Sequence, residues 1–170
     1  VVFGQPDGLL PNLRVLMQAM RYASTFGFSV WLRPQEISLT NDGVAHDGEV
    51  ATRLGLPTVP VCAETIAISN IILLAKETGV RVHLCRISSA EGLTMVRAAK
   101  QQGLPMTCDV TINHLHLSDM DIGFFDSNCH LMTPLRSSSD RDALRNGLLD
   151  GTIDAICSDH APVDEDAKLL

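Results

Sequence analysis

The chain has 170 residues, 45% of them hydrophobic and 19% charged, which is the composition of a globular domain with a sizeable core. Its formal net charge is -7 and it has no basic run, so nucleic acids and anionic membranes are disfavoured as partners. No apolar run reaches about 18 residues and the first residues lack the charged start of a signal peptide, so we expect neither a membrane span nor a leader.

Strand-like and helix-like segments alternate along the chain. Leu13, Leu16 and Met20 recur at helical spacing, and Ser88-Ser89-Ala90-Glu91 matches a capping box at the start of another helix. The predicted elements begin with a strand ending at residue 3, a helix over 12–25, a strand over 28–32 and a short helix over 46–54. A helix over 64–76, a strand over 80–85, a helix over 89–102 and a strand over 105–110 follow. After a long connection over 115–138 come a helix from about 139 to 149 and a buried strand over 153–157.

This order predicts an α/β fold with a parallel sheet, because helices connect successive strands. No internal repeat or linker is visible, so residues 1–170 are expected to form a single α/β domain. Five strands are too few for a closed eight-stranded barrel, which needs about 250 residues. The chain is therefore either an open sheet or part of a barrel.

Polar residues follow the ends of four predicted strands, namely Arg33, Arg86, Asn113 and Asp159. In parallel α/β folds this edge of the sheet carries the active site. Asp159 directly follows a strand-like run and is a candidate metal ligand or general base. His160 beside it is a candidate to orient that carboxylate, although a structural role is favoured.

The cysteines and the other histidines favour structural roles. The five cysteines form no Cys-x-x-Cys pair, so buried thiols in a reducing cytoplasm account for them better than disulfides or a zinc finger. His83 falls on an apolar strand, which favours a hydrogen-bonded core histidine over a ligand. His114 and His116 are expected at the rim of a loop.

Several spaced motifs resemble those of dihydroorotases, a family of the amidohydrolase superfamily. The stretch from Asp150 to Pro162 is similar to the signature of the family's last barrel strand. Further segments fit in the same register: Gly55-Leu56-Pro57, Ala63-Glu64, Val82-His83-Leu84-Cys85, and Pro134-Leu135-Arg136 with Ser139-Asp140-Arg141. The resemblance covers nearly the whole chain and implies part of a (β/α)8 TIM-type barrel, roughly from the fourth to the eighth strand.

Dihydroorotases are zinc-dependent hydrolases that open or close the dihydroorotate ring in pyrimidine synthesis. The resemblance implies zinc ligands on a first-strand His-x-His, an Asp, two single histidines and a final Asp. The His-x-His would precede Val1, and only the final Asp is clearly kept, as Asp159. The earlier Asp falls on Pro6 in an ungapped register, or on Asp7 after a shift of one residue.

Arginines stand at both single-histidine positions, as Arg33 and Arg86. A guanidinium has no lone pair for zinc and stays protonated. At about 4 Å and an effective dielectric of about 20, its charge opposes Zn²⁺ by roughly 8 kcal/mol before relaxation. We therefore predict no metal cofactor at Asp159, and a remnant site made of Arg33, Arg86, Asn113, Met132 (for a family Asn), His160 and Val163 (for a family His).

An unpaired buried carboxylate would be costly, which motivates the hypothesis that Arg33 or Arg86 pairs with Asp159 in place of the metal. The alternative is that both arginines project to solvent.

Three functions remain open. The resemblance is greatest to a non-catalytic dihydroorotase-like chain that assembles with the catalytic chain of aspartate transcarbamoylase, which implies an inactive cytoplasmic partner of that enzyme. The alternative is a zinc-dependent dihydroorotase that uses Asp159 and possibly Asp7, with the missing ligands supplied from outside this chain. The third is another binding protein derived from an amidohydrolase. Raw sheet edges also predict self-association.

Overall fold

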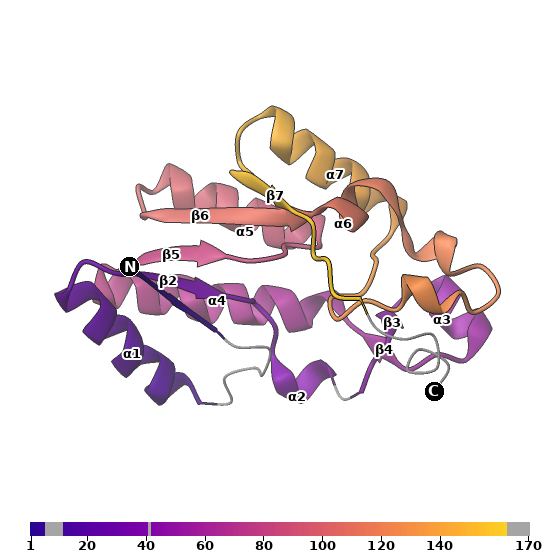
Figure 1. Cartoon of the computed structure of the whole chain (residues 1–170), viewed down its shortest axis with the longest axis horizontal. Helices are drawn as coiled ribbons and strands as arrows, with labels where there is room; N and C mark the ends of the chain where they lie inside the picture. Colours follow the sequence, from indigo (N-terminus) through magenta and orange to yellow (C-terminus); the bar gives the residue numbers. More distant parts are fainter. Residues whose placement is uncertain (6–11, 41, 163–170) are drawn as a thin grey trace.

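The computed structural model describes residues 1–5, 12–40 and 42–162. Its centre is a five-stranded sheet in the order β1-β2-β5-β6-β7 (Figure 1). All four neighbouring pairs are parallel, which confirms the predicted sheet. A doubly wound sheet reverses its strand order at a switch point, whereas consecutive barrel strands do not, so the sequential order favours part of a barrel. The strands are β1 (Val2–Gly4), β2 (Ser29–Leu32), β5 (Arg81–Leu84), β6 (Met106–Thr111) and β7 (Ala155–Cys157).

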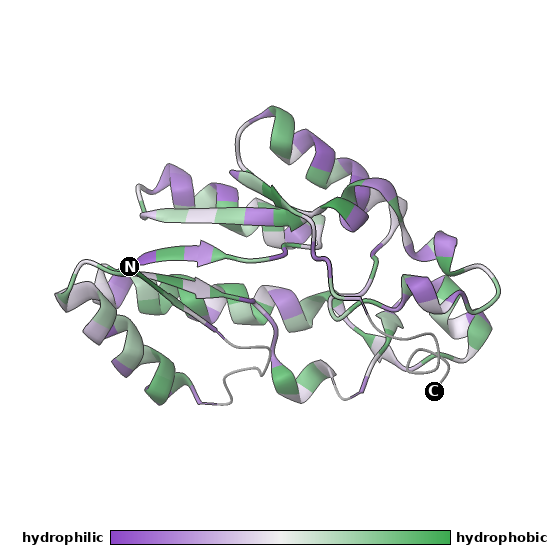
Figure 2. Ribbon diagram, viewed as in Figure 1, coloured by the Kyte–Doolittle hydropathy of each residue, from purple (hydrophilic) through white to green (hydrophobic). Residues whose placement is uncertain are grey.

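Four long helices cover one face of the sheet: α1 (Leu13–Thr25), α4 (Val61–Thr78), α5 (Ala90–Gln101) and α7 (Ser138–Leu149). Alternate strand residues point toward them, because side chains on a strand alternate between faces. Val30, Val82 and Met106 are in register across β2, β5 and β6 and belong to this core. In Figure 2 hydrophobic and hydrophilic residues alternate along β5, and the long helices show bands of both kinds, as expected for elements with one buried face.

Capping side chains fix where three of these helices begin. Asn12 accepts a hydrogen bond from the Arg14 N–H, and Ser89 accepts one from the Gly92 N–H at the predicted start of α5. Helix α7 begins slightly earlier than predicted, because Ser137 caps it by accepting from the Asp140 N–H.

A second, two-stranded parallel sheet lies near the carboxyl ends of the main strands (Figure 1). Its strands and the nearby helices are β3 (Ala45–His46), β4 (Thr58–Val59), α2 (Ile37–Thr40) and α3 (Glu49–Leu54). The connection after β6 contains α6 (Ile112–His116) and two 3₁₀ turns, Asp119–Ile122 and Ser127–Cys129. Ile122, Cys129 and Leu135 from this connection pack with Ala45 and Val50 in a second small core. Of these elements the sequence predicted only α3.

The last strand differs from its prediction as a buried segment over 153–157. Strand β7 begins at Ala155, and both Ala155 and Ile156 are exposed. The reason is its place, since β7 pairs only with β6 among the described strands and forms an edge of the sheet. Among the described residues, no helix combines the length and apolar character needed to cross a membrane.

Candidate functional site

The polar residues predicted at the strand ends lie at one edge of the sheet. Arg33 directly follows β2, Arg86 follows β5 by two residues, and Asp159 follows β7 by two residues. Asn113 lies half-buried in the first turn of α6, directly after β6. Because β2, β5, β6 and β7 are parallel neighbours, their carboxyl ends meet here.

Arg86 and Asp159 form an ion pair at this edge. The Arg86 Nε atom lies 2.9 Å from Asp159 Oδ1, and the two side chains are 30% and 9% exposed, respectively. Both residues adopt left-handed backbone conformations, with φ angles of 61° and 50°. Such conformations cost a non-glycine residue about 1 kcal/mol or more, so surrounding contacts must hold them. The pair confirms the hypothesis that an arginine stands beside Asp159.

Asp109 on β6 supports the backbone of Arg86. Its Oδ1 atom accepts a hydrogen bond from the Arg86 N–H at 2.7 Å, and its Oδ2 atom lies 3.0 Å from His83 Nε2. Burial acts to raise the pKa of Asp109, but the hydrogen bonds from His83 and Arg86 outweigh it and leave the pKa below its ordinary value. His83 also bonds Thr107 Oγ1 through Nδ1 at 2.7 Å, which confirms the prediction of a hydrogen-bonded core histidine.

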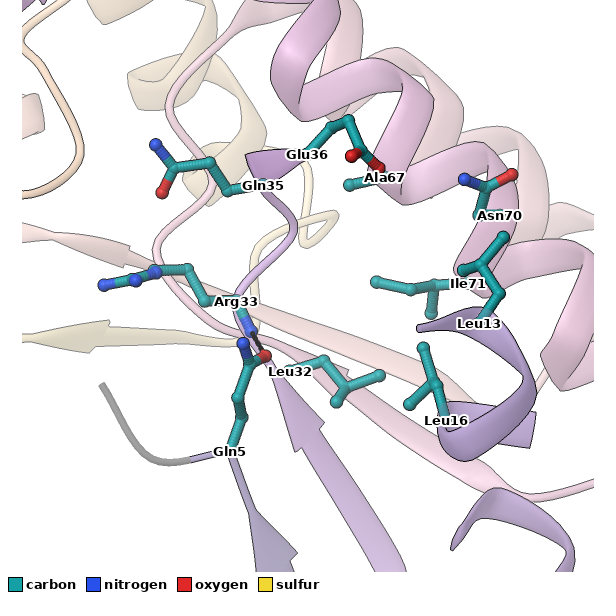
Figure 3. Close-up of a pocket in the computed structure, with 10 residues that line it drawn as sticks. All are labelled: Gln5, Leu13, Leu16, Leu32, Arg33, Gln35, Glu36, Ala67, Asn70 and Ile71. Carbon is teal, nitrogen blue, oxygen red and sulfur yellow. Dashed lines mark hydrogen bonds between the residues drawn. The ribbon is translucent and has the colours of Figure 1, made fainter. Parts of the chain in front are cut away.

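Arg33 lies at the end of β2, beside an apolar hollow. Its backbone N–H donates to Gln5 Oε1 at 3.1 Å, as Figure 3 shows. The apolar hollow in that figure is lined by Leu13 and Ile71 among others, and the Arg33 guanidinium points away from it. The guanidinium instead contacts the sulfur of Met132. Arg33 stands at the position of a family metal ligand and Met132 at that of a substrate-binding residue, so two residues of the predicted remnant site contact each other.

The other predicted site residues take no visible part in this pairing. His160 is exposed, and the ion-pair partner of Asp159 is Arg86. Met132 is 52% exposed. Asp7 and Val163 lie outside the described residues.

Sequence reasoning missed a buried network built on Glu64 and Arg136, which are 3% and 4% exposed. The Glu64 carboxylate accepts hydrogen bonds from the backbone N–H groups of Ser88 and Ser89, at 2.6 and 3.0 Å, and from the Ser89 hydroxyl. Burial raises the pKa of Glu64, and the nearby charge of Arg136 opposes that rise. A carboxylate inside the apolar first turns of α4 was the available signal.

Arg136 joins the network to the small sheet. Its Nε atom donates to Ser88 Oγ at 3.2 Å, and its Nη1 atom donates to the Val59 carbonyl at 2.6 Å. The same Nη1 lies 3.3 Å from His46 Nδ1. Arg136 therefore ties the loop after β5 to β3 and β4, next to the strand-end site.

The prediction that His114 lies at a loop rim is wrong. The side chain is 2% exposed, with Nδ1 2.7 Å from Thr111 Oγ1 and Nε2 3.1 Å from the Pro134 carbonyl. The cause is α6, which turns His114 inward, whereas His116 is exposed as expected.

The buried His114 predicts a loss of stability in acid. Burial lowers the pKa of His114 below its ordinary value of 6.5, so the unfolded chain binds its proton first. The contribution to stability is complete above pH 6.5 and falls as the pH drops toward the folded pKa, by at most about 1.4 kcal/mol per pH unit. Urea unfolding at pH 7.5, 6.5 and 5.5 should show a smaller decline for His114→Gln than for the parent. His116→Gln is the control and should decline like the parent; equal slopes in all three proteins would contradict the assignment.

The strand-end residues do not fit the zinc site that the family resemblance implies. The one clearly kept ligand, Asp159, is engaged by the Arg86 guanidinium, and a second cation, Arg33, lies at the neighbouring strand end. Neither arginine offers a lone pair to a metal.

Comparisons with known proteins agree with the motifs. A sequence model described as "Dihydro-orotase-like" matches residues 11–92. The chain is 42% identical over 169 residues to a dihydroorotase-like protein of Pseudomonas putida, and this alignment covers 99% of the chain and 40% of that protein. It is 44% identical over 157 residues to a dihydroorotase of Bacillus caldolyticus, and this alignment covers 92% of the chain and 37% of that protein. The chain thus spans about 40% of the length of these relatives.

Solved structures confirm the fold. The structure of D-hydantoinase from Thermus sp. superposes with a TM-score of 0.82 at 21% identity, over 99% of this chain and 38% of that one. The parallel sheet is therefore part of a TIM-type barrel. By sequence, the chain is similar over nearly its whole length to members of the dihydroorotase family.

Proposed function

We propose that the chain is part of a cytoplasmic dihydroorotase-like protein that has lost ring hydrolysis and supports the assembly of aspartate transcarbamoylase. The ion pair between Arg86 and Asp159 carries the first half of this proposal. Hydrolysis of a cyclic amide in this family needs a metal to lower the pKa of a water molecule and to polarise the carbonyl. The Arg86 guanidinium, 2.9 Å from Asp159 Oδ1, repels a metal cation at this carboxylate and disfavours its uptake of a proton from water.

The assembly role has a different support. Curated relatives of two kinds match this chain, one named dihydroorotase-like protein and one named dihydroorotase. The motifs of the chain resemble most the non-catalytic kind, whose role is to bind the catalytic chain of aspartate transcarbamoylase.

A second candidate function is that of an active zinc-dependent dihydroorotase. The 44% identity to the Bacillus caldolyticus dihydroorotase favours it, because this value exceeds the 42% identity to the dihydroorotase-like relative. This candidate requires Asp159 to leave Arg86 and requires further ligands from residues outside this chain.

One experiment separates the candidates. The full protein is co-expressed with a catalytic chain of aspartate transcarbamoylase, purified through a tag on the former, and assayed for dihydroorotate hydrolysis with added zinc. We expect a stoichiometric complex by light scattering, and a kcat/KM at least about 10³-fold below that of the Bacillus caldolyticus enzyme, since the metal-activated water is lost.

The opposite outcomes are distinct. Turnover that disappears in Asp159→Asn would overturn the inactive assignment and establish the second candidate. Absence of both turnover and complex would overturn the assembly role and leave another binding function derived from an amidohydrolase.

A further inference from the structure

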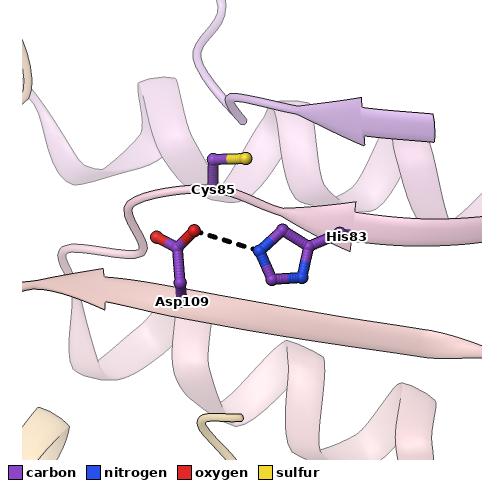
Figure 4. A group of neighbouring side chains, drawn as sticks. All are labelled: His83, Cys85 and Asp109. Carbon is purple, nitrogen blue, oxygen red and sulfur yellow. Dashed lines mark hydrogen bonds and ion pairs between the residues drawn. The ribbon is translucent and has the colours of Figure 1, made fainter. Parts of the chain in front are cut away.

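Three side chains with metal-binding atoms converge on the face of the sheet that the long helices leave uncovered. His83 and Cys85 are two residues apart at the end of β5, and Asp109 lies on the neighbouring strand β6. Leu84 and Cys108 are paired partners that point into the helix-covered core, so their chain neighbours point to the opposite face. The ligand atoms of the three residues all lie within 4.8 Å of one another, and Figure 4 shows the group at adjacent strands.

We propose that His83, Cys85 and Asp109 form a binding site for a divalent cation of the zinc type. Imidazole nitrogen, thiolate sulfur and carboxylate oxygen are the donors that zinc accepts in proteins. Three protein ligands leave a fourth position for water or another small ligand. None of the three residues stands at a family ligand position, so the site is separate from the one at Asp159 and differs from it by containing a thiol.

Hydrogen bonds already occupy the polar atoms of His83 and Asp109 that would not bind the metal. The His83 Nδ1 atom lies 2.7 Å from Thr107 Oγ1, which leaves Nε2 directed at Asp109 Oδ2. The other carboxylate oxygen of Asp109 accepts the Arg86 N–H at 2.7 Å. Metal-binding histidines and carboxylates are oriented by such outer hydrogen bonds, so the cation would replace the proton between His83 Nε2 and Asp109 Oδ2, and the Cys85 sulfur would close on it from within 4.8 Å.

The charges of the group also balance. Once the cation displaces the proton of the Cys85 thiol, the thiolate and the Asp109 carboxylate together carry the two negative charges that neutralise it. The neighbouring Arg86 guanidinium would oppose the cation, but Asp159 binds it at 2.9 Å and offsets its charge. The Arg86–Asp159 ion pair therefore lowers the electrostatic cost of a divalent cation bound by His83, Cys85 and Asp109.

Access to the group is open from one side. A cavity of about 250 Å³ is lined by Cys85 and Asp109 together with Gln5, Trp31 and the two arginines, Arg33 and Arg86. This is room enough for a cation to enter and for a water molecule to complete its coordination. The Cys157 thiol lies 3.5 Å from Asp109 Oδ1 at the edge of the group, as a further sulfur donor nearby.

Cobalt is the probe for this site, because Co²⁺ bound by a thiolate gives a sulfur-to-metal charge-transfer band in the near ultraviolet. We expect titration of the metal-free full protein to give this band at one Co²⁺ per chain, and added Zn²⁺ to abolish it. The band should be lost in Cys85→Ser, and the affinity should fall at least about tenfold in Asp109→Asn. Cys62→Ser, which changes an exposed thiol at the start of α4, is the matched control and should keep the band.

A measurement on the unaltered protein removes any dependence on folding of the variants. Alkylation followed by peptide mass mapping should show Cys85 protected by Zn²⁺ and Cys62 equally reactive with and without it. Absence of the charge-transfer band in the parent, an unchanged band in folded Cys85→Ser, or unprotected Cys85 would each overturn the site. None of these readouts depends on dihydroorotate turnover or on a partner chain.

Discussion

Replacing Arg136 by methionine should lower the free energy of unfolding by about 3–5 kcal/mol, because it leaves the buried Glu64 carboxylate without a nearby positive charge. The change also removes the donors to the Val59 carbonyl and to Ser88 Oγ. Methionine keeps most of the side-chain volume, so the loss reports charge and hydrogen bonding more than an empty space. Urea unfolding followed by circular dichroism at pH 7.5 measures it.

The matched control is Arg21→Met. Arg21 pairs with Glu77 at 3.2 Å, but the two side chains are 55% and 63% exposed. Solvent screens such a pair, so this variant should lose less than about 1 kcal/mol. Similar losses in the two variants would show that the Glu64–Arg136 network is not the element that holds the small sheet to the main one.

The pH dependence of the Arg136→Met variant gives a further check with a definite sign. Burial raises the pKa of Glu64, and removing the arginine charge should raise it further. A carboxyl group with a raised folded pKa stabilises the protein below its unfolded pKa, and that stabilisation is lost as the pH rises through the folded value. The deficit of the variant relative to the parent should therefore shrink as the pH falls from 7.5 toward 5. A stability deficit that does not change with pH would mean that the charge of Glu64 is not what destabilises the variant.

The strand-end pair was predictable from sequence because it rests on one topological rule. Parallel neighbours bring their carboxyl ends together, so residues after β5 and β7 had to share an edge of the sheet. The rule did not choose between Arg33 and Arg86 as the partner of Asp159. That choice depends on the left-handed turns at Arg86 and Asp159, and on the Asp109 carboxylate that holds one of them.

The small sheet and the buried network were beyond sequence reasoning for a different reason. Strands of two residues, such as β3 and β4, have no periodicity to detect. Arg136 reaches Val59 and His46 across long sequence separations, and nothing in the local pattern marks such contacts. His114 was misplaced because a five-residue helix, α6, reverses which side of the connection is buried.

Replacing Leu84 by alanine should lower the free energy of unfolding by about 2–5 kcal/mol, through lost burial and the cavity left behind. Leu84 is fully buried on β5, the central strand of the five, and belongs to the core beneath the long helices. Leu73→Ala is the control of the same residue type, since Leu73 on α4 is 61% exposed, and it should lose less than about 1 kcal/mol.

The Leu84 variant also tests how the fold positions its site. His83 and Cys85 flank Leu84 and point to the opposite face, so the variant separates two ways of holding these groups in place, core packing and the hydrogen bonds of the strand. A rigid strand predicts that Co²⁺ binding to folded Leu84→Ala protein stays within about tenfold of the parent, because the hydrogen bonds of β5 to β2 and β6 remain. A loss of binding much greater than that, in protein that is still folded, would show that core packing and not the strand ladder holds His83, Cys85 and Asp109 together.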